Sequence, residues 1–168
     1  MASTLALLRR LTAANVDFVL VGGLAAIVHG SSVVTEDAEV CLRFDEQTLS
    51  RLFRALEGLN PRERMNAARP SLGDDPTRFV GYRNLYLMTD EGVLDLLGEI
   101  VAVGAFDAVR AASTEVDLGE FRCRVLSLEA LIACKRALGR PKDLRVVSEL
   151  EAVLQRLKGL THGTTSGR

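Results

Sequence analysis

The sequence predicts an α/β (α+β) fold, in which helices pack on a small mixed β-sheet and a helical C-terminal portion closes the structure. Residues 16–41 follow the order of strand, glycine turn, helix, loop and second strand. Residues 79–97 and 115–125 return to strand character around turn residues, whereas the chain from residue 127 onward has helical periodicity. These three observations favour a mixed α and β fold.

Length and composition bound the class of protein. With 168 residues, 48% of them hydrophobic, the chain is expected to form one domain with a packed interior. We expect a core over residues 1–125, a helical pair over 126–160 that packs on it, and a disordered tail over 161–168. A net charge of -1 gives no overall attraction to polyanions, and 5% aromatic residues without Trp disfavour a base-stacking surface.

Cysteines and apolar runs indicate the cellular compartment. Three scattered cysteines are too few for a disulfide framework or a zinc site, so we expect buried thiols in a reducing cytoplasm. The most apolar run, residues 18–28, is far shorter than the roughly 20 residues that cross a bilayer. Arg9 and Arg10 follow the first apolar residues, which is not the order of a signal peptide. The sequence therefore predicts a soluble, cytoplasmic protein with no membrane association.

The chain begins with a predicted helix that Ser3 or Thr4 caps. Its expected apolar face consists of Leu5, Leu8 and Leu11. Residues 16–21 are apolar and partly β-branched, which is typical of a short buried strand. A glycine pair then ends the strand, and the apolar run over 24–29 predicts a helix.

The next predicted strand, residues 35–42, alternates acids with small or apolar residues. Asp37 and Glu39 are two residues apart, so both side chains point to the same side of the sheet. Two carboxylates without an adjacent cation are unfavourable unless water or a metal ion lies between them. This strand is therefore the first candidate for a functional site.

The middle of the chain combines a helix with an irregular segment. Residues 45–57 predict a helix with Asp45 as its N-cap. Residues 60–77 contain three prolines and little apolar patterning, so a mobile surface loop is expected. The arginines of this segment can contact a phosphate or simply face solvent, and solvation is the favoured interpretation for Arg62, Arg64 and Arg69.

Two further hairpins are predicted. Residues 85–88 and 93–97 flank a Thr-Asp-Glu-Gly turn, and Asp95 is the one charge in the second of these strands. A structural Asp95 would be a buried acid with a hydrogen-bonding partner, which is uncommon. Residues 106–111 form a short predicted helix, and residues 115–125 form a hairpin that turns near Gly119.

The last third of the chain is predicted to be helical. Ser127 caps a helix over residues 128–138, and Gly139 ends it. Pro141 opens a second helix that runs to about Lys158. The apolar stripe of this helix is expected to consist of Leu144, Val147, Leu150, Val153, Leu154 and Leu157.

The residues around the glycine pair resemble those of nucleotidyltransferases of the polymerase-β type, in particular the small stand-alone bacterial group that includes toxin–antitoxin relatives. The matching residues, in order, are Gly22-Gly23-Leu24-Ala25, His29-Gly30, Thr35-Glu36-Asp37 and Asp37-Ala38-Glu39-Val40. In that family an apolar strand with an Asp before two leucines brings a third carboxylate to the site, which here is Asp95. The resemblance covers about residues 16–150. Two residues differ from the family pattern: Val33 replaces an Arg, and Glu39 replaces an Asp.

The resemblance implies phosphoryl transfer from a nucleoside triphosphate (NTP). Asp37, Glu39 and Asp95 would then be the catalytic residues and the ligands of one or two Mg²⁺ ions. The nucleoside monophosphate would pass to a hydroxyl group of a protein, a tRNA end or a small molecule. A binding module without turnover is the alternative, acting as a regulatory or toxin–antitoxin partner, because Val33 and Glu39 depart from the pattern. A plain interaction domain is a third interpretation.

Residues that bind the nucleotide are also implied. Close backbone approach and helix N–H groups favour phosphate contact at the glycine pair, Gly22 and Gly23. Ser31 and Ser32 are expected to hydrogen-bond phosphate or the loop backbone. Lys135 and Lys142 would approach the triphosphate, whereas Arg140 is equally explained by phosphate contact or by the dipole of a helix end. His29 is expected to be a helix-end residue that bonds a carbonyl group.

Overall fold

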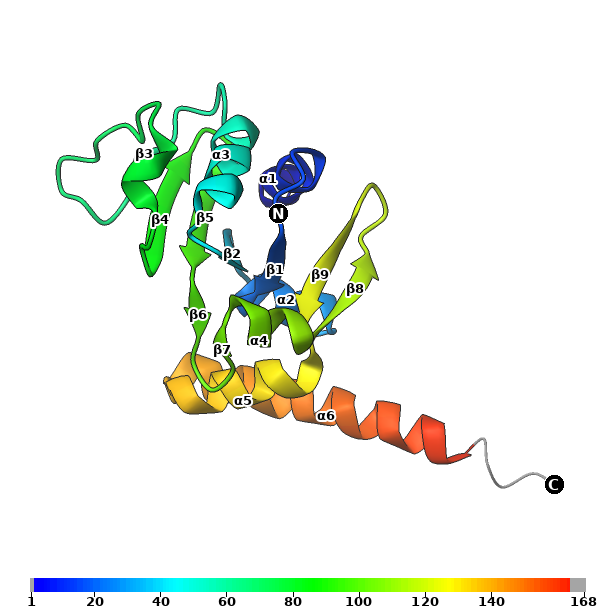
Figure 1. Cartoon of the computed structure of the whole chain (residues 1–168). Coiled ribbons are helices and arrows are strands. Elements are labelled where there is room, and N and C mark those ends of the chain that lie inside the picture. The colour runs from blue at the N-terminus through cyan, green and yellow to red at the C-terminus, as the bar shows by residue number, and fades with distance from the viewer. Residues whose placement is uncertain (1, 164–168) are drawn as a thin grey trace.

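A seven-stranded mixed sheet forms the centre of the computed structural model, which describes residues 2–163 (Figure 1). The strand order is β3-β4-β5-β2-β1-β9-β8. The pairs β1–β9 and β2–β5 are parallel, and the other neighbouring pairs are antiparallel. The strands are β1 (Phe18–Val21), β2 (Asp37–Leu42), β3 (Arg62–Glu63), β4 (Asn84–Thr89), β5 (Gly92–Leu97), β8 (Ser113–Asp117) and β9 (Arg122–Leu126). The predicted α/β fold class is confirmed.

Six α-helices and one 3-10 helix surround the sheet in the described part of the chain. They are α1 (Ala2–Ala13), α2 (Gly22–Val28), α3 (Glu46–Ala55), η1 (Pro76–Phe79), α4 (Phe106–Ala111), α5 (Leu128–Leu138) and α6 (Pro141–Gly163). A separate small hairpin joins β6 (Glu99–Ile100) to β7 (Gly104–Ala105). In Figure 1, α1 and α3 lie near one end of the sheet, and α5 and α6 cross beyond the β6–β7 hairpin at the other end.

Alternation along β2 and β5 separates an apolar face from a polar face. Ala38 pairs with Leu94 and Val40 pairs with Leu96, and all four side chains are fully buried in the main core. That core also contains Leu7, Leu8 and Leu11 of α1, which contacts both strands. The intervening acidic residues must point the other way. The period of two in the sequence is thus what presents the acids on one side of the sheet.

The structure confirms several helix boundaries that capping residues predicted. The Asp45 carboxylate accepts the Thr48 N–H at 2.7 Å before α3, and the Ser127 hydroxyl accepts the Ala130 N–H at 3.3 Å before α5. Gly139 ends α5, as predicted, and α4 spans the predicted residues 106–111. Both predicted hairpins, β4–β5 and β8–β9, are also present.

The first helix differs from the prediction by its start and its face. The helix begins at Ala2, so Ser3 and Thr4 lie inside it and neither is the N-cap. Thr4 is buried, and its hydroxyl donates to the Glu36 carbonyl at 3.0 Å. Leu5 is exposed, whereas Leu7 takes the place expected for it in the core. The buried face of the helix therefore contains Thr4 and Leu7 in place of Leu5.

The predicted loop over residues 60–77 contains regular structure. Strand β3 pairs with β4 at the edge of the sheet, and Arg64 continues this pairing by donating its N–H to the Tyr86 carbonyl at 2.8 Å. Leu72, which belongs to this segment, is fully buried. The sequence did not reveal this because a two-residue strand is too short to show a period.

Helix α6 is longer than predicted. It continues past Lys158 to Gly163, so the first residues of the predicted disordered tail are helical, and residues 164–168 lie outside the described residues. The buried side of the helix contains Val146, Val147 and Leu150, whereas Leu144 and Leu157 of the expected stripe are exposed. The last turns project beyond the body of the molecule in Figure 1. No helix within residues 2–163 has the combination of length and apolar character that a membrane span requires.

Candidate functional site

A cavity of about 700 Å³ lies between the polar face of the sheet and the end of α5. Glu39 of β2 and Asp95 of β5 form its acidic wall, and Lys135 and Arg140 form a basic wall. A third acid, Glu99 of β6, also lines the cavity. Apolar residues of the β6–β7 hairpin and α5 complete the lining, among them Ile100, Val101 and Leu138. The volume is within the range of small-molecule sites, which is about 300–1,000 Å³.

The acidic wall is produced by strand register. Glu39 and Asp95 are direct neighbours in the parallel β2–β5 pair, so their side chains project from adjacent positions on one face. Asp37 pairs with Val93, one pleat earlier on the same face, and is not among the residues that line the cavity. The structure therefore brings two of the three predicted carboxylates to the cavity, with Asp37 on the same face beyond it.

Glu39 turns back onto the glycine pair. Its Oε2 atom accepts the Gly23 N–H at 2.9 Å. Gly22 has a φ of +65°, and a Cβ at this position would lie 1.6 Å from the same oxygen. The absence of a side chain at Gly22 thus makes room for the Glu39 carboxylate. The N–H that the sequence assigned to a phosphate is already bonded to an acid of the chain.

Asp95 forms an ion pair with Arg64, which directly follows the edge strand β3. The Nη2 atom of Arg64 donates to both Asp95 oxygens, at 2.6 and 2.8 Å, and the side chains are 28% and 13% exposed, respectively. The guanidinium group also lies 5.7 Å from the centre of the Tyr86 ring. Burial raises the pKa of Asp95, and the Asp37 and Glu39 carboxylates add to this effect; together they outweigh Arg64, so the pKa lies above its ordinary value.

Both cations of the basic wall share one carboxylate. Asp143 lies in the first turn of α6 and is 1% exposed. It accepts Lys135 Nζ at 3.0 Å and Arg140 Nε at 2.5 Å. Burial alone would raise the pKa of Asp143, but Arg140 and Lys135 hold it below its ordinary value. The start of α6 therefore fixes the two cations at the edge of the cavity.

Other predicted binding residues lie elsewhere. Ser31 and Ser32 both donate to Glu149 of α6, the hydroxyl groups at 2.7 and 2.9 Å and the Ser32 N–H at 2.9 Å. These three bonds hold the pKa of Glu149 below its ordinary value. Lys142 is exposed and is not among the residues that line the cavity. His29 follows α2 and its Nε2 lies 2.7 Å from the Leu126 carbonyl, which confirms its predicted helix-end position.

The carboxylates of the polar face do not have the arrangement of a metal site. Within residues 2–163, no group of three or more His, Cys, Asp or Glu side chains is arranged to hold a metal ion. The reason is visible in the contacts, because Glu39 bonds the Gly23 backbone and both Asp95 oxygens face Arg64. A divalent ion needs such oxygens free. The donor set therefore does not fit the predicted Mg²⁺ site in this arrangement.

Sequence reasoning missed Arg64 as a partner of the acidic wall, and it missed Asp143 as the holder of the basic wall. Arg64 was assigned to a solvated loop, since nothing local indicates that this segment pairs with β4. An acid near the start of a helix, such as Asp143, is already explained by the positive end of that helix. The useful signal was the neighbouring cation-rich stretch that ends in Asp143, which offers one acid to several bases.

Comparisons with known proteins give limited information. No protein-family model matches the chain, and no curated protein matches it. Among solved structures, it is similar to a protein from Thermotoga maritima that is described as a "putative nucleotidyltransferase". The two chains share 16% identity, with a TM-score of 0.49 over 92% of each chain. We derive no activity from so distant a likeness, and membership of the nucleotidyltransferase family remains a prediction from the sequence.

Proposed function

We propose that the cavity binds an NTP, in a nucleotidyltransferase-like binding module. The observation that carries this proposal is the pair of cations, Lys135 and Arg140, that lines a cavity of suitable volume together with the acidic wall. Cations at the mouth would contact the polyphosphate, and the apolar lining would contact the base. The resemblance of the glycine and acid motifs supports the same class of ligand.

Arg140 is the better placed of the two cations for a ligand. Its side chain is 52% exposed, and only Nε is used in the bond to Asp143 that fixes it. The N–H groups of its terminal nitrogens can donate to phosphate oxygens in a fixed fork. Lys135 is buried beside it and adds a second positive charge. We assign Ser31 and Ser32 to holding the loop against Glu149.

Binding without turnover is the function that the geometry supports best. Nucleotidyl transfer of the predicted type uses carboxylates that hold Mg²⁺, and here the acids of the wall have partners within the chain. We therefore derive no catalytic step through a metal ion. In such a module the residues of the cavity bind and orient the nucleotide, and a regulatory or toxin–antitoxin partner would recognise the complex.

The test is thermal stabilisation and calorimetric titration with each of the four NTPs. A ligand present at about 100 times its Kd should add about 2.7 kcal/mol to the free energy of unfolding. Arg140→Met should weaken binding at least about tenfold, since a hydrogen bond to a charged group contributes about 1.5–3 kcal/mol. Arg145→Met removes an exposed arginine of the same helix region and should leave binding unchanged. Absence of binding by every NTP would contradict the proposal.

Nucleotidyl transfer is the second candidate, favoured by the direct adjacency of Glu39 and Asp95. Its test is incubation with α-³²P-labelled NTP, Mg²⁺ and a cell lysate, which supplies protein, tRNA and small-molecule acceptors. Label on an acceptor that disappears with Asp37→Asn would support transfer. Binding without any label would favour the module. A cytoplasmic location and a cognate partner remain predictions.

A further inference from the structure

The acidic face requires positive charge. Asp37, Glu39 and Asp95 project from two adjacent strands toward one side of the sheet. Burial raises the pKa of Asp95, and the neighbouring Asp37 and Glu39 carboxylates add to the rise. Glu39 is partly compensated by a backbone N–H, which carries no net charge. A cation must therefore come from outside these two strands.

Arg64 supplies that cation from the edge of the sheet. Its backbone bonds the Tyr86 carbonyl, and Tyr86 is the register neighbour of Asp95 on β4. The guanidinium group is thereby placed on Asp95, beside the Tyr86 ring. The bond to Asp95 raises the pKa of Arg64 against the effect of burial, and the Asp37 carboxylate adds to the rise. Arg64 thus interacts with more than one acid of the face.

Two hydrogen bonds to Asp95 place the Arg64 guanidinium group, but one of its nitrogens is left without a partner in the part of the chain that the structure describes. Within residues 2–163, its Nε is buried and has no hydrogen-bond partner. A buried donor without an acceptor is unfavourable, so an Arg64 side chain without other constraints would expose its Nε atom to water. The attraction of the carboxylates offsets this penalty because one terminal nitrogen reaches both oxygens of Asp95. Charge-assisted hydrogen bonds to Asp95 therefore hold the Arg64 side chain in place.

We infer that Arg64 takes the place of a divalent metal ion on this face, so that the cavity binds its polyphosphate ligand without Mg²⁺. The part of this inference that concerns the polyphosphate ligand rests on the proposed nucleotide binding. The part that concerns metal ions does not. Arg64 provides one fixed positive charge where an ion would otherwise be recruited from solution. Lys135 and Arg140 line the cavity, and Arg64 reaches it through its ion pair with Asp95, which is a lining residue.

The first test measures metal binding directly, by electron paramagnetic resonance of Mn²⁺. The wild-type chain should not bind Mn²⁺ in the millimolar range, and Arg64→Met should bind at least about tenfold more tightly, because a fixed charge next to the acids has been removed. Arg62→Met is the matched control, since it removes an exposed arginine two residues earlier and should bind no Mn²⁺. In Arg64→Met/Asp95→Asn, the gained binding should be lost. Circular dichroism verifies that each variant is folded.

Wild-type Mn²⁺ binding as tight as that of Arg64→Met, or no gain in that folded variant, would overturn the inference. The second test titrates ATP in EDTA and in Mg²⁺. The wild-type chain should bind equally in both, and Arg64→Met should bind more weakly in EDTA and recover in Mg²⁺. ATP binding by the wild type that requires Mg²⁺ would also overturn the inference. Failure of every NTP to bind would refute the proposed function alone, because the Mn²⁺ result stands without it.

Discussion

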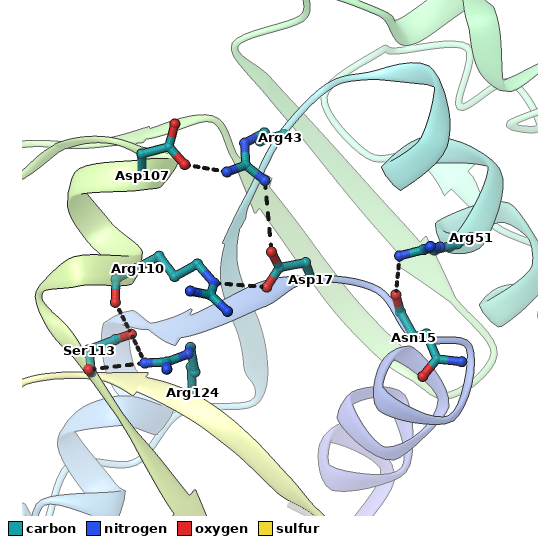
Figure 2. Close-up of polar contacts among 8 residues, drawn as sticks. All are labelled: Asn15, Asp17, Arg43, Arg51, Asp107, Arg110, Ser113 and Arg124. Atoms are coloured by element: carbon teal, nitrogen blue, oxygen red, sulfur yellow. Dashed lines mark hydrogen bonds and ion pairs between the residues drawn. The ribbon is translucent and has the colours of Figure 1, made fainter.

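Two charged regions at opposite ends of strands β1 and β2 contain the same kinds of ion pair in different surroundings. At the end of β1 that leads into the glycine pair, Asp95–Arg64 and Asp143–Lys135 border a cavity. At the other end, Arg43 lies between Asp107 and Asp17, and Arg110 also contacts Asp17 (Figure 2). Both regions contain arginines and aspartates within ion-pair distance.

The difference between these regions is exposure. The four ion-paired side chains in Figure 2 are 41% to 81% exposed, namely Asp17, Arg43, Asp107 and Arg110. Asp143 and Asp95 are only 1% and 13% exposed. Water and salt screen the exposed pairs, so they contribute little to stability. In the cavity region, removal of one partner leaves a largely buried charge without its counter-ion. The comparison shows that burial beside a cavity, rather than the presence of ion pairs, indicates a site.

The largest effect is expected at Asp143. Asp143→Ala should lower the free energy of unfolding by about 3–5 kcal/mol, because Lys135 is left buried without its partner. Since the folded pKa of Asp143 is lowered, the contribution is present above the ordinary Asp pKa of about 3.9 and is lost as the pH falls through the folded value. Urea unfolding at pH 7 and at lower pH measures both effects. A loss below about 1 kcal/mol at pH 7 would remove the distinction between the regions.

A smaller effect, in addition to the strain of the backbone, is expected from the contact between Gly22 and Glu39. Gly22→Ala places a Cβ against the Glu39 carboxylate, whereas Gly58→Ala has the same kind of backbone, with a φ of +78°, and open space around it. Both variants should lose about 1–3 kcal/mol from the unfavourable φ. Gly22→Ala should lose about 1.5–3 kcal/mol more, the contribution of a hydrogen bond to a charged group. Urea unfolding of each variant alone and with Glu39→Ala measures this additional loss, which should shrink in the double variant.

The smallest effect is expected in the exposed cluster. Asp107→Asn should change the free energy of unfolding by less than about 1 kcal/mol, because both partners of the Arg43 pair remain hydrated. The remaining effect should decrease in 1 M salt, where the screening length is about 3 Å. Urea unfolding at two salt concentrations measures the change. An effect as large as that of Asp143→Ala would show that exposure is not the deciding variable.

Local signals in the sequence predicted the parts of the fold that depend on local chemistry. The ends of α5 follow from the Ser127 cap and Gly139, and the β4–β5 hairpin follows from two apolar runs on either side of a Thr-Asp-Glu-Gly turn. The adjacency of Glu39 and Asp95 was predicted only with the help of the family resemblance. A period of two predicts which side chains lie on one face of a strand. It does not predict which other strand lies beside it in the sheet.

Contacts between distant parts of the chain were not predictable in this way. Arg64 and Asp95 are 31 residues apart in the sequence, and Ser31 and Glu149 are 118 apart. A long side chain can satisfy its charge in many places, so its sequence position says little about its partner. The same limit explains why the glycine pair was assigned to a phosphate, although Glu39 occupies that position.

Helix α6 holds the two cations of the cavity and the loop before β2 through two of its acidic side chains. Asp143 fixes the two cations, and Glu149 fixes the serine loop that leads into β2. The two acids are separated by about 9 Å of helix axis, and each residue adds about 100° of rotation. The relative placement of loop and cations is consequently set by helical phase. Inserting a single residue between Asp143 and Glu149 would turn one acid away from its partners while leaving the composition of the cavity unchanged.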